Sequence, residues 1–126
     1  MFRFYVLLVA LFWAHPTLAS VTCGKASWYA MTSQTASGER ASPNTMTAAH
    51  RTLPFGTKVK VTNLRNGREV IVRINDRGPF TKGRILDLTK RAASKLGFVN
   101  AGWTKVKMKP LNKLSHKSVR SLRINC

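Results

Sequence analysis

Three carboxylates of this chain lie among residues that favour turns, where their side chains could do chemistry. They occur in the segments Thr35-Ala-Ser-Gly-Glu39, Asp76-Arg-Gly-Pro-Phe80 and Leu86-Asp87-Leu88. The sequence has only four Asp and Glu against 22 Lys and Arg, so a protein this basic has little need of acids for solubility. Glu39, Asp76 and Asp87 are therefore candidate acid–base groups for chemistry on a neutral or anionic substrate.

Each of these acids also has a purely structural interpretation. Glu39 can pair with a neighbouring cation, and Asp76 can accept hydrogen bonds from the amides of the turn that follows it. Asp87 can serve the N-terminus of a helix that is expected just downstream. The sequence leaves both interpretations open.

His50 ends the segment Thr47-Ala-Ala-His50 and has two interpretations as well. It is either an orienting group or proton relay for the acids, or a histidine packed inside the fold with its hydrogen bonds satisfied. The fourth acid, Glu69, lies beside Asn66-Gly67 and is expected to be a surface charge of a hairpin.

The elements that must position these side chains are mostly strands. Strict alternation at residues 58–62 and 103–108 predicts strands with one buried face. Asn66-Gly67 predicts a hairpin turn leading into a returning strand at 69–74, since both residues tolerate positive φ. A further short strand is expected at 26–30.

One short helix is predicted at residues 90–96, with Thr89 as its N-cap and Gly97 as its end. Residues 45–50 are interpreted as a short helical turn, and Trp103 is placed in the core. Several short strands with one helix predict a small closed barrel, because closure removes exposed strand edges.

The first residues have the pattern of a secretory signal peptide. Arg3 gives a positive start, residues 4–14 are apolar but too few to span a bilayer comfortably, and Thr17-Leu-Ala19 supplies small residues for cleavage. We expect residues 1–19 to be removed, leaving residues 20–126 as one domain with a short basic tail. The mature chain would then be periplasmic, cell-wall associated or secreted, with no transmembrane segment.

The two cysteines, Cys23 and Cys126, lie at the two ends of the expected mature chain. An oxidising compartment favours a disulfide between them. Such a bond would close almost the whole mature chain and stabilise the fold by about 4–5 kcal/mol in the chain-entropy model. The alternative is two free or intermolecular thiols.

The strong positive charge points to an anionic partner. The formal net charge is +18 for the whole chain, or +17 once Arg3 is removed with the signal. We expect no specific nucleic acid, because the chain is exported, its bases are spread over the domain and no zinc-finger or aromatic RNA-binding signature is present. Anionic wall or envelope polymers are the expected partners. No metal or cofactor is expected, because the possible ligand residues are scattered.

A set of motifs, following one another in order, resembles one bacterial family. They occupy residues 26–30, 35–39, 47–57, 59–67, 73–80 and 83–88. In this order they resemble the rare lipoprotein A (RlpA) family, and the likeness runs from about Lys25 to Lys109. The chain departs from the family at one position of this motif. Family members commonly have an acid three residues beyond the Glu, whereas this chain has Ser42 there.

The resemblance implies a fold, an activity and a site. It implies a six-stranded double-psi β-barrel and a lytic transglycosylase that cuts peptidoglycan glycan strands, preferring strands stripped of stem peptides. It marks Glu39, His50 and Asp76 as catalytic candidates. The residues expected to bind substrate lie beside these acids or in the same motifs: Tyr29, Thr35, Ser37, Asn75, Arg77 and Asp87.

The sequence leaves three functions open. The first is the transglycosylase, which would leave 1,6-anhydro-muramic ends. The second is an expansin-like protein that binds or loosens peptidoglycan or another polysaccharide without cutting it, which the missing acid at Ser42 favours. The third is a wall-associated cationic or antimicrobial factor, which the charge alone would permit.

Overall fold

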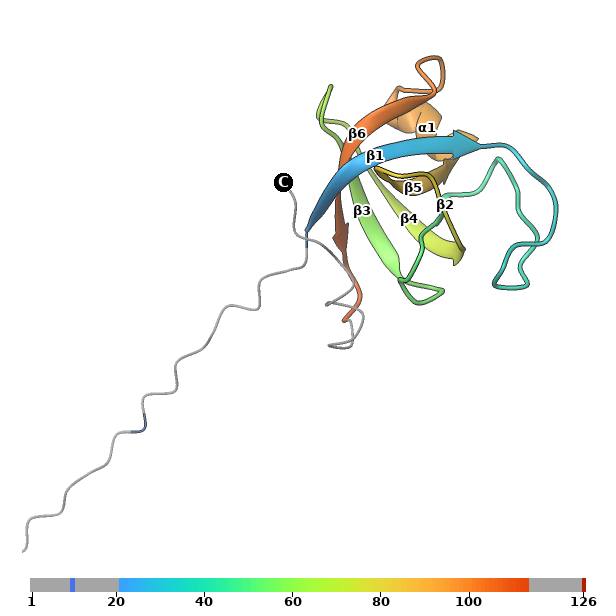
Figure 1. Ribbon diagram of the computed structural model, residues 1–126, viewed down its shortest axis with the longest axis horizontal. Helices are drawn as coiled ribbons and strands as arrows, with labels where there is room; N and C mark the ends of the chain where they lie inside the picture. Colours follow the sequence, from blue (N-terminus) through green and yellow to red (C-terminus); the bar gives the residue numbers. More distant parts are fainter. Residues whose placement is uncertain (1–9, 11–20, 114–125) are drawn as a thin grey trace, which may run out of the picture.

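The computed structural model describes Ala10, residues 21–113 and Cys126, and it contains one closed β-barrel. The expected signal peptide and most of the basic tail lie outside the described residues. Six strands and one helix follow one another as β1 (Thr22–Tyr29), β2 (Thr47–Ala49), β3 (Lys58–Asn63), β4 (Glu69–Asp76), β5 (Arg84–Thr89), α1 (Lys90–Leu96) and β6 (Trp103–Pro110). The strand order around the barrel is β1-β5-β2-β4-β3-β6 (Figure 1).

Two of the strand pairings are parallel, β1 with β5 and β2 with β4, and the other four are antiparallel. The predicted hairpin joins β3 to β4, with Gly67 at φ 77°. The predicted strands at 58–62, 69–74 and 103–108 are confirmed as parts of β3, β4 and β6, and the strand predicted at 26–30 coincides with the second half of β1.

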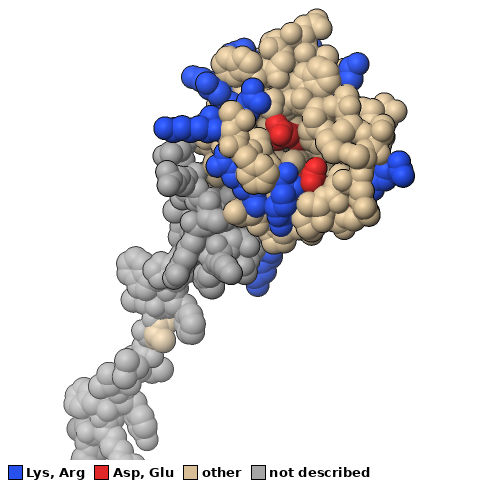
Figure 2. All heavy atoms as spheres, turned by 45° about the vertical axis from the view of Figure 1, so that its right-hand side comes forward, with Lys and Arg blue, Asp and Glu red and all other residues tan. Residues whose placement is uncertain are grey.

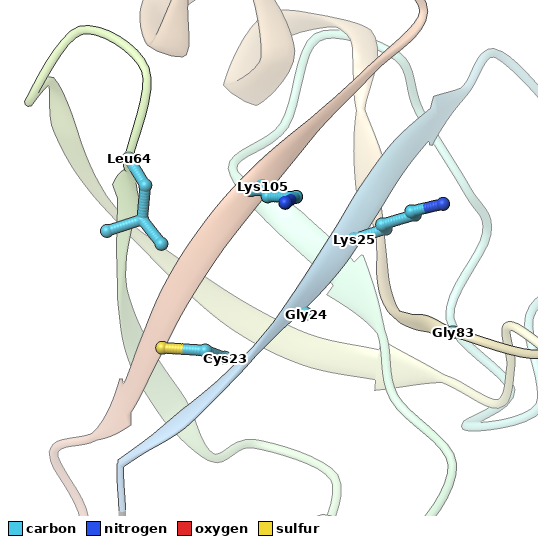
Figure 3. A pocket seen from close by; sticks show the side chains of 6 residues that line it. All are labelled: Cys23, Gly24, Lys25, Leu64, Gly83 and Lys105. Carbon is cyan, nitrogen blue, oxygen red and sulfur yellow. The ribbon is translucent and has the colours of Figure 1, made fainter. Parts of the chain in front are cut away.

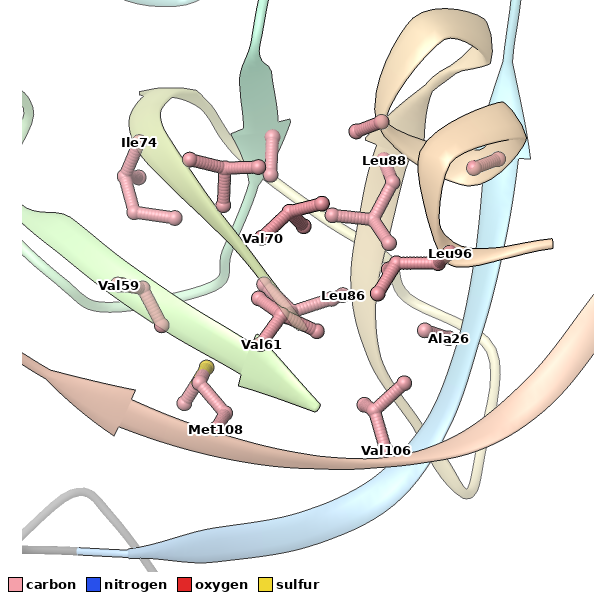
Figure 4. Close-up of a cluster of buried hydrophobic side chains, with 14 of the residues drawn as sticks. Ala26, Val59, Val61, Val70, Ile74, Leu86, Leu88, Leu96, Val106 and Met108 are labelled. Atoms are coloured by element: carbon pink, nitrogen blue, oxygen red, sulfur yellow. The ribbon is translucent and has the colours of Figure 1, made fainter. Parts of the chain in front are cut away.

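Alternating apolar side chains from the strands fill the barrel. The fully buried members include Val59, Val61, Val72, Ile74, Leu86, Leu88, Val106 and Met108 (Figure 4). Burial of each such side chain stabilises the fold by roughly 1.5–3 kcal/mol relative to leaving it exposed. Leu96 of α1 joins the same cluster, so the helix is packed onto the barrel and not left as a separate element.

The helix prediction is confirmed at both ends. Thr89 Oγ1 accepts a hydrogen bond from the Ala92 N–H at 3.4 Å, and Gly97 adopts the left-handed conformation at φ 80°. The side-chain amide of Asn63 donates to the Leu96 carbonyl at 2.8 Å. One of the carbonyls that a helix end leaves unpaired therefore has a partner.

The predicted helical turn at 45–50 is wrong, because residues 47–49 form strand β2. β2 lies between β4 and β5 and hydrogen-bonds with both. A three-residue strand that is Ala-rich has little strand signal of its own, and pairing on both sides determines its conformation. The placement of Trp103 in the core is also wrong: its ring lies on the outside of β6, between the cations of Lys25 and Arg65.

The predicted disulfide is confirmed. Cys23 of β1 is bonded to Cys126, with their Cα atoms 5.1 Å apart, a usual separation for this bond. It joins residues 103 positions apart in sequence, so the end of the chain is tied to the first strand. Glu69 is also as predicted, half exposed on the hairpin with Lys60 Nζ 3.7 Å away.

Candidate active site

The strand register brings two of the candidate acids to one outer face of the barrel. Ser27 of β1 pairs with Asp87 of β5, Asp87 pairs with Ala49 of β2, and Ala49 pairs with Asp76 of β4. Directly paired residues on neighbouring strands project to the same face. Asp76 and Asp87 therefore flank Ala49 on one face, with their backbones about two strand spacings, or roughly 9.5 Å, apart.

Asp76 reaches this face because of an irregularity in β4. The inward side chains of β4 are Val70, Val72 and Ile74, and regular alternation would turn residue 76 inward as well. Instead Ala48 pairs with Ile74 while the next residue, Ala49, pairs with Asp76. Asn75 is thus the extra residue of a bulge, and a bulge shifts the following side chain to the other face.

The loop that carries Glu39 is docked against the end of β4. Ala36 N–H donates to Asp76 Oδ1 at 2.9 Å, and Ser37 N–H donates to the Asn75 carbonyl at 3.3 Å. Within the loop, Thr35 Oγ1 donates to the Glu39 carbonyl at 2.6 Å and lies 2.9 Å from Ser37 Oγ. The side chains of Thr35 and Ser37 therefore shape the loop, and the loop in turn places Glu39 beside β4.

Glu39 forms a two-fold ion pair with Arg73. Both carboxylate oxygens of Glu39 accept from the guanidinium, each at 2.7 Å. The hydrogen bond from Arg73 lowers the pKa of Glu39, and the side-chain amide of Asn75 acts in the same direction. Glu39 is therefore held as an anion, paired with the positive charge of Arg73.

Asp76 is held by one of its two oxygens. Oδ1 accepts from the N–H groups of Ala36 and Arg77, both at 2.9 Å. Within the described residues, Oδ2 has no hydrogen-bond partner. The carboxyl group is thus fixed in orientation while one oxygen remains available to a ligand.

Tyr29 lies close to all three candidate acids. Burial, together with the negative charges of Asp76, Asp87 and Glu39 in that order, raises the pKa of its hydroxyl to about 12. The hydroxyl is buried and has no hydrogen-bond partner in the described part of the chain. Asn75, which is 2% exposed, has an unpartnered Oδ1 in the same region. Buried polar groups normally have partners, so these two unpaired atoms mark this region as a candidate binding site.

Ser27 is a site residue that the sequence analysis missed. Its hydroxyl donates a hydrogen bond to Asp87 Oδ1 across the β1–β5 pairing. Asp87 lies in the middle of β5, and the first turn of α1 contains no acid, so the interpretation of Asp87 as a helix-terminus residue is wrong. Ser27 could have been found only with the register of two strands that are 60 residues apart.

His50 and Arg77 form hydrogen bonds with the backbone of the turn that packs against Asp76. His50 is 7% exposed, and its Nδ1 accepts from the N–H groups of Thr52 and Leu53 at 3.1 and 3.0 Å. The Arg77 guanidinium donates to the carbonyls of His50 and Leu53 and stacks on Phe55. His50 N–H also donates to the Asp76 carbonyl at 3.1 Å, so His50 positions the Asp76 backbone.

The buried imidazole makes folding stability depend on pH. Burial, together with the positive charges of Arg77 and Arg51, lowers the pKa of His50 from 6.5 to about 4. Between these values the unfolded chain binds a proton that the folded chain does not, so stability falls as the pH is lowered through this window. We expect this histidine to account for a loss of at most about 3 kcal/mol.

The variant His50→Asn tests this expectation. An Asn side-chain oxygen can accept from the N–H groups two and three residues on, as His50 does, but it does not titrate. Denaturant unfolding of both proteins at about pH 7 and about pH 4.5 should show a smaller acid loss in the variant. An equal loss in both proteins would assign the pH dependence to the carboxylates alone.

The charge distribution marks this face of the molecule. Carboxylate atoms appear in a hollow near the centre of the face in Figure 2, and Lys and Arg lie mostly around its margin. Among the described residues, no group of three or more His, Cys, Asp or Glu side chains could hold a metal ion. None of the helices in the described ranges is long and apolar enough to cross a membrane.

Comparison with solved structures supports the fold. A Streptomyces papain inhibitor has a TM-score of 0.62 and 23% identity, covering 73% of this chain and 94% of the inhibitor. The expansin of Clavibacter michiganensis has a TM-score of 0.60 and 24% identity, covering 75% of this chain and 52% of the expansin. At identities this low, the similarity supports the fold and nothing further. The shared fold agrees with the predicted double-psi β-barrel.

Sequence relatives point to one family. A protein named probable endolytic peptidoglycan transglycosylase RlpA in Synechocystis sp. is 56% identical over 92 residues. Proteins named endolytic peptidoglycan transglycosylase RlpA are 53% identical over 91 residues in Neisseria meningitidis serogroup A and 42% over 116 in Rickettsia felis. The matches cover 71%, 70% and 87% of this chain. The chain spans only 29%, 38% and 51% of these relatives.

A family model described as "Lytic transglycolase" matches residues 21–108. This range includes every strand except the last two residues of β6. It also contains all of the candidate site residues, from Ser27 to Asp87. The chain therefore belongs to the lytic transglycolase family of double-psi β-barrels and, within it, to the RlpA proteins.

Proposed function

We propose that this chain is a peptidoglycan lytic transglycosylase that cuts glycan strands and leaves 1,6-anhydro-muramic ends. The names of its RlpA relatives support this activity. Because the chain spans only part of those relatives, the support comes mainly from the site itself. Strands stripped of stem peptides are the proposed substrate, as the resemblance to the family implies.

The observation that carries the proposal is the setting of Asp76. Its Oδ1 is fixed by two backbone N–H groups, and its Oδ2 is without a protein partner in the described residues. The side chain lies at the end of β4 and is only partly buried, so a sugar ring can approach it. A single carboxyl group in this position can both give and recover a proton.

The proposed reaction needs no water as nucleophile. The acid form of Asp76 gives its proton to the glycosidic oxygen as the bond from muramic C1 to that oxygen breaks. The C6 hydroxyl of the same muramic residue then attacks C1, and its proton passes to the Asp76 carboxylate. The C1–O6 bond closes the 1,6-anhydro ring, and Asp76 is again protonated.

The neighbouring groups divide the remaining tasks. Glu39, kept anionic by Arg73, places a negative charge near the oxocarbenium-like transition state. The Tyr29 hydroxyl and Asn75 Oδ1 have no partners of their own in the described residues, so we propose that they bind sugar hydroxyls. Asp87, with Ser27 bonded to it, would bind the substrate on the other side of Ala49.

Four other candidate residues position the site in this proposal and do not contact the substrate: Thr35, Ser37, His50 and Arg77. Thr35 and Ser37 build the loop that holds Glu39, while Arg77 and His50 hold the turn behind Asp76. A catalytic role for His50 stays a prediction, and the hydrogen bonds of its imidazole favour a positioning role.

The cellular setting follows from the substrate. Peptidoglycan lies outside the cytoplasm, so we propose that residues 1–19 direct export and that residues 20–126 act as one domain in the periplasm, in the wall or outside the cell. The net charge of +18 also supports attraction to anionic wall or envelope polymers.

One observation favours the binding protein as a second candidate. Both oxygens of Glu39 are occupied by Arg73, so only Asp76 and Asp87 remain for direct contact with sugar. A groove with fewer free acids could hold glycan without cutting it, as in the expansin-like alternative.

The experiment that separates the two candidates is digestion of purified, peptide-stripped glycan with the exported protein. Mass spectrometry of the products should find new 1,6-anhydro-muramic ends. Glycan that is retained by the protein, yet shows no new ends after long incubation, would establish the binding candidate instead.

A further inference from the structure

The outer side of the barrel formed by β1, β6 and β3 carries a concentration of lysines. We call this surface the lysine face. Its members alternate with the buried core residues of the same strands, so their side chains project outward: Lys25 of β1, Lys58 and Lys60 of β3, and Lys105, Lys107 and Lys109 of β6. The ion pair of Lys60 with Glu69 is the single carboxylate contact made by these lysines within the described residues.

The register places several of these lysines directly against one another. Lys25 is paired with Lys105 across β1 and β6, and Lys60 is paired with Lys109 across β3 and β6. Like charges that are directly opposite on neighbouring strands destabilise a sheet. An arrangement that keeps two such pairs on one face is favourable when an anion lies between the strands.

A hollow on the same face supports this interpretation. A cavity of about 320 Å³ is lined by Lys25 and Lys105, together with Cys23, Gly24, Leu64 and Gly83 (Figure 3). Beside it, the Trp103 ring holds Lys25 Nζ at 5.0 Å and the Arg65 guanidinium carbon at 4.3 Å from its centroid. The cations are thus gathered around a recess.

The lysine face is separate from the candidate active site. The acids lie on β5 and β4, on either side of β2, whereas five of the six lysines lie on β6 and β3 at the opposite part of the strand order and the sixth, Lys25, lies on β1. β1 lies at the boundary between the two surfaces. One ligand can therefore occupy the lysine face while a glycan strand occupies the candidate active site.

We propose that the lysine face binds a linear phosphodiester polymer, with successive phosphates seated along Lys105, Lys107 and Lys109 of β6 and with Lys25 and Lys60 beside the first and the last of these. Alternate residues of β6 are about 6.7 Å apart, and a glycerol phosphate chain carries one phosphate per three-carbon unit, a comparable spacing. The strands twist around the barrel, so the lysines follow a curved line. A flexible chain can follow that line, whereas a planar bilayer would meet only part of it. The proposal does not depend on the proposed cleavage.

The test compares two variants of equal charge. In one, Lys105, Lys107 and Lys109 of β6 are changed to Gln. In the control, Lys82, Lys90 and Lys95, which are exposed on the loop before β5 and on α1, are changed to Gln. Binding of each protein to purified poly(glycerol phosphate) is measured by calorimetry at physiological salt, with circular dichroism as the check on folding.

We expect the β6 variant to bind at least about tenfold more weakly than the unchanged protein, since each exposed charge contact contributes up to about one factor of five. The control variant should lose no more than about twofold to threefold. Equal losses in both variants would show a diffuse effect of net charge and overturn the proposal. Tighter, β6-dependent binding to vesicles of phosphatidylglycerol and phosphatidylcholine would overturn it in favour of a membrane surface.

The two variants also separate this proposal from the proposed function. On soluble peptide-stripped glycan, which is free of phosphodiester polymer, both should cleave as the unchanged protein does. A β6 variant that fails to bind the polymer but still cleaves supports the lysine face, whatever the fate of the acid assignments. If the unchanged protein does not bind poly(glycerol phosphate) at all, the lysine face has no such role.

Discussion

Asp76→Asn is expected to abolish glycan cleavage while leaving the barrel folded and glycan retention largely intact. Asn keeps the shape of the side chain, and its Oδ1 can still accept from the N–H groups of Ala36 and Arg77. It cannot give and recover a proton. Loss of a general acid or base typically lowers the rate by at least about 10²–10⁴.

A matched control is available on the same strand. Glu69→Gln also removes one carboxylate from β4, but at a half-exposed hairpin position with only Lys60 beside it, and it should leave cleavage unchanged. Release of 1,6-anhydro ends per unit time is the measurement for both variants. Full activity in Asp76→Asn would contradict the assignment of Asp76 as the proton donor, and Glu39 or Asp87 would then be the candidate for that role.

Removal of the disulfide is expected to be the largest single loss of stability. The Cys23–Cys126 bond spans 103 positions of the chain, so it restricts the unfolded state over nearly all of the barrel. The chain-entropy model gives a loss of about 4–5 kcal/mol for a loop of this length. A small domain has a total stability of about 5–15 kcal/mol, so the variant would be close to unfolding.

The measurement is denaturant unfolding of the oxidised protein and of Cys23→Ser/Cys126→Ser, each with and without a reductant. The reductant should weaken the unchanged protein toward the variant and have no effect on the variant itself. A difference below about 1 kcal/mol would mean that the bond constrains the unfolded chain far less than its span implies.

Local signals predicted much of this fold. The alternation at residues 58–62, the Asn66-Gly67 turn and the caps at Thr89 and Gly97 each depend on neighbours in sequence. The structure has these features where the sequence placed them. They define the β3–β4 hairpin and α1, which need no distant partner to be recognised.

The remaining features depend on distant pairing. β2 is a strand because β4 and β5 lie on both sides of it, and its Thr-Ala-Ala sequence does not reveal this. The bulge at Asn75, which turns Asp76 to the outer face, becomes visible only when β4 is aligned with β2. The bond from Ser27 to Asp87 likewise requires the β1–β5 register.

The candidate site shows the same division. The order of the motifs marked Glu39, His50 and Asp76, and the structure places the first and third near Tyr29. The motifs could not show that Arg73 pairs with Glu39, because their separation of 34 residues is bridged by a docked loop. Nor could the motifs show that the His50 imidazole accepts hydrogen bonds from the backbone N–H groups of Thr52 and Leu53 in its own turn.

The most direct test of the central claim is the origin of the oxygen at the new glycan ends. Peptide-stripped glycan is digested in heavy-oxygen water, and the ends are analysed by mass spectrometry. Attack by the C6 hydroxyl predicts that the new 1,6-anhydro-muramic ends contain no heavy oxygen. It also predicts that the Asp76→Asn digest contains no new 1,6-anhydro-muramic ends. New reducing ends that carry heavy oxygen would show hydrolysis by water and contradict the account.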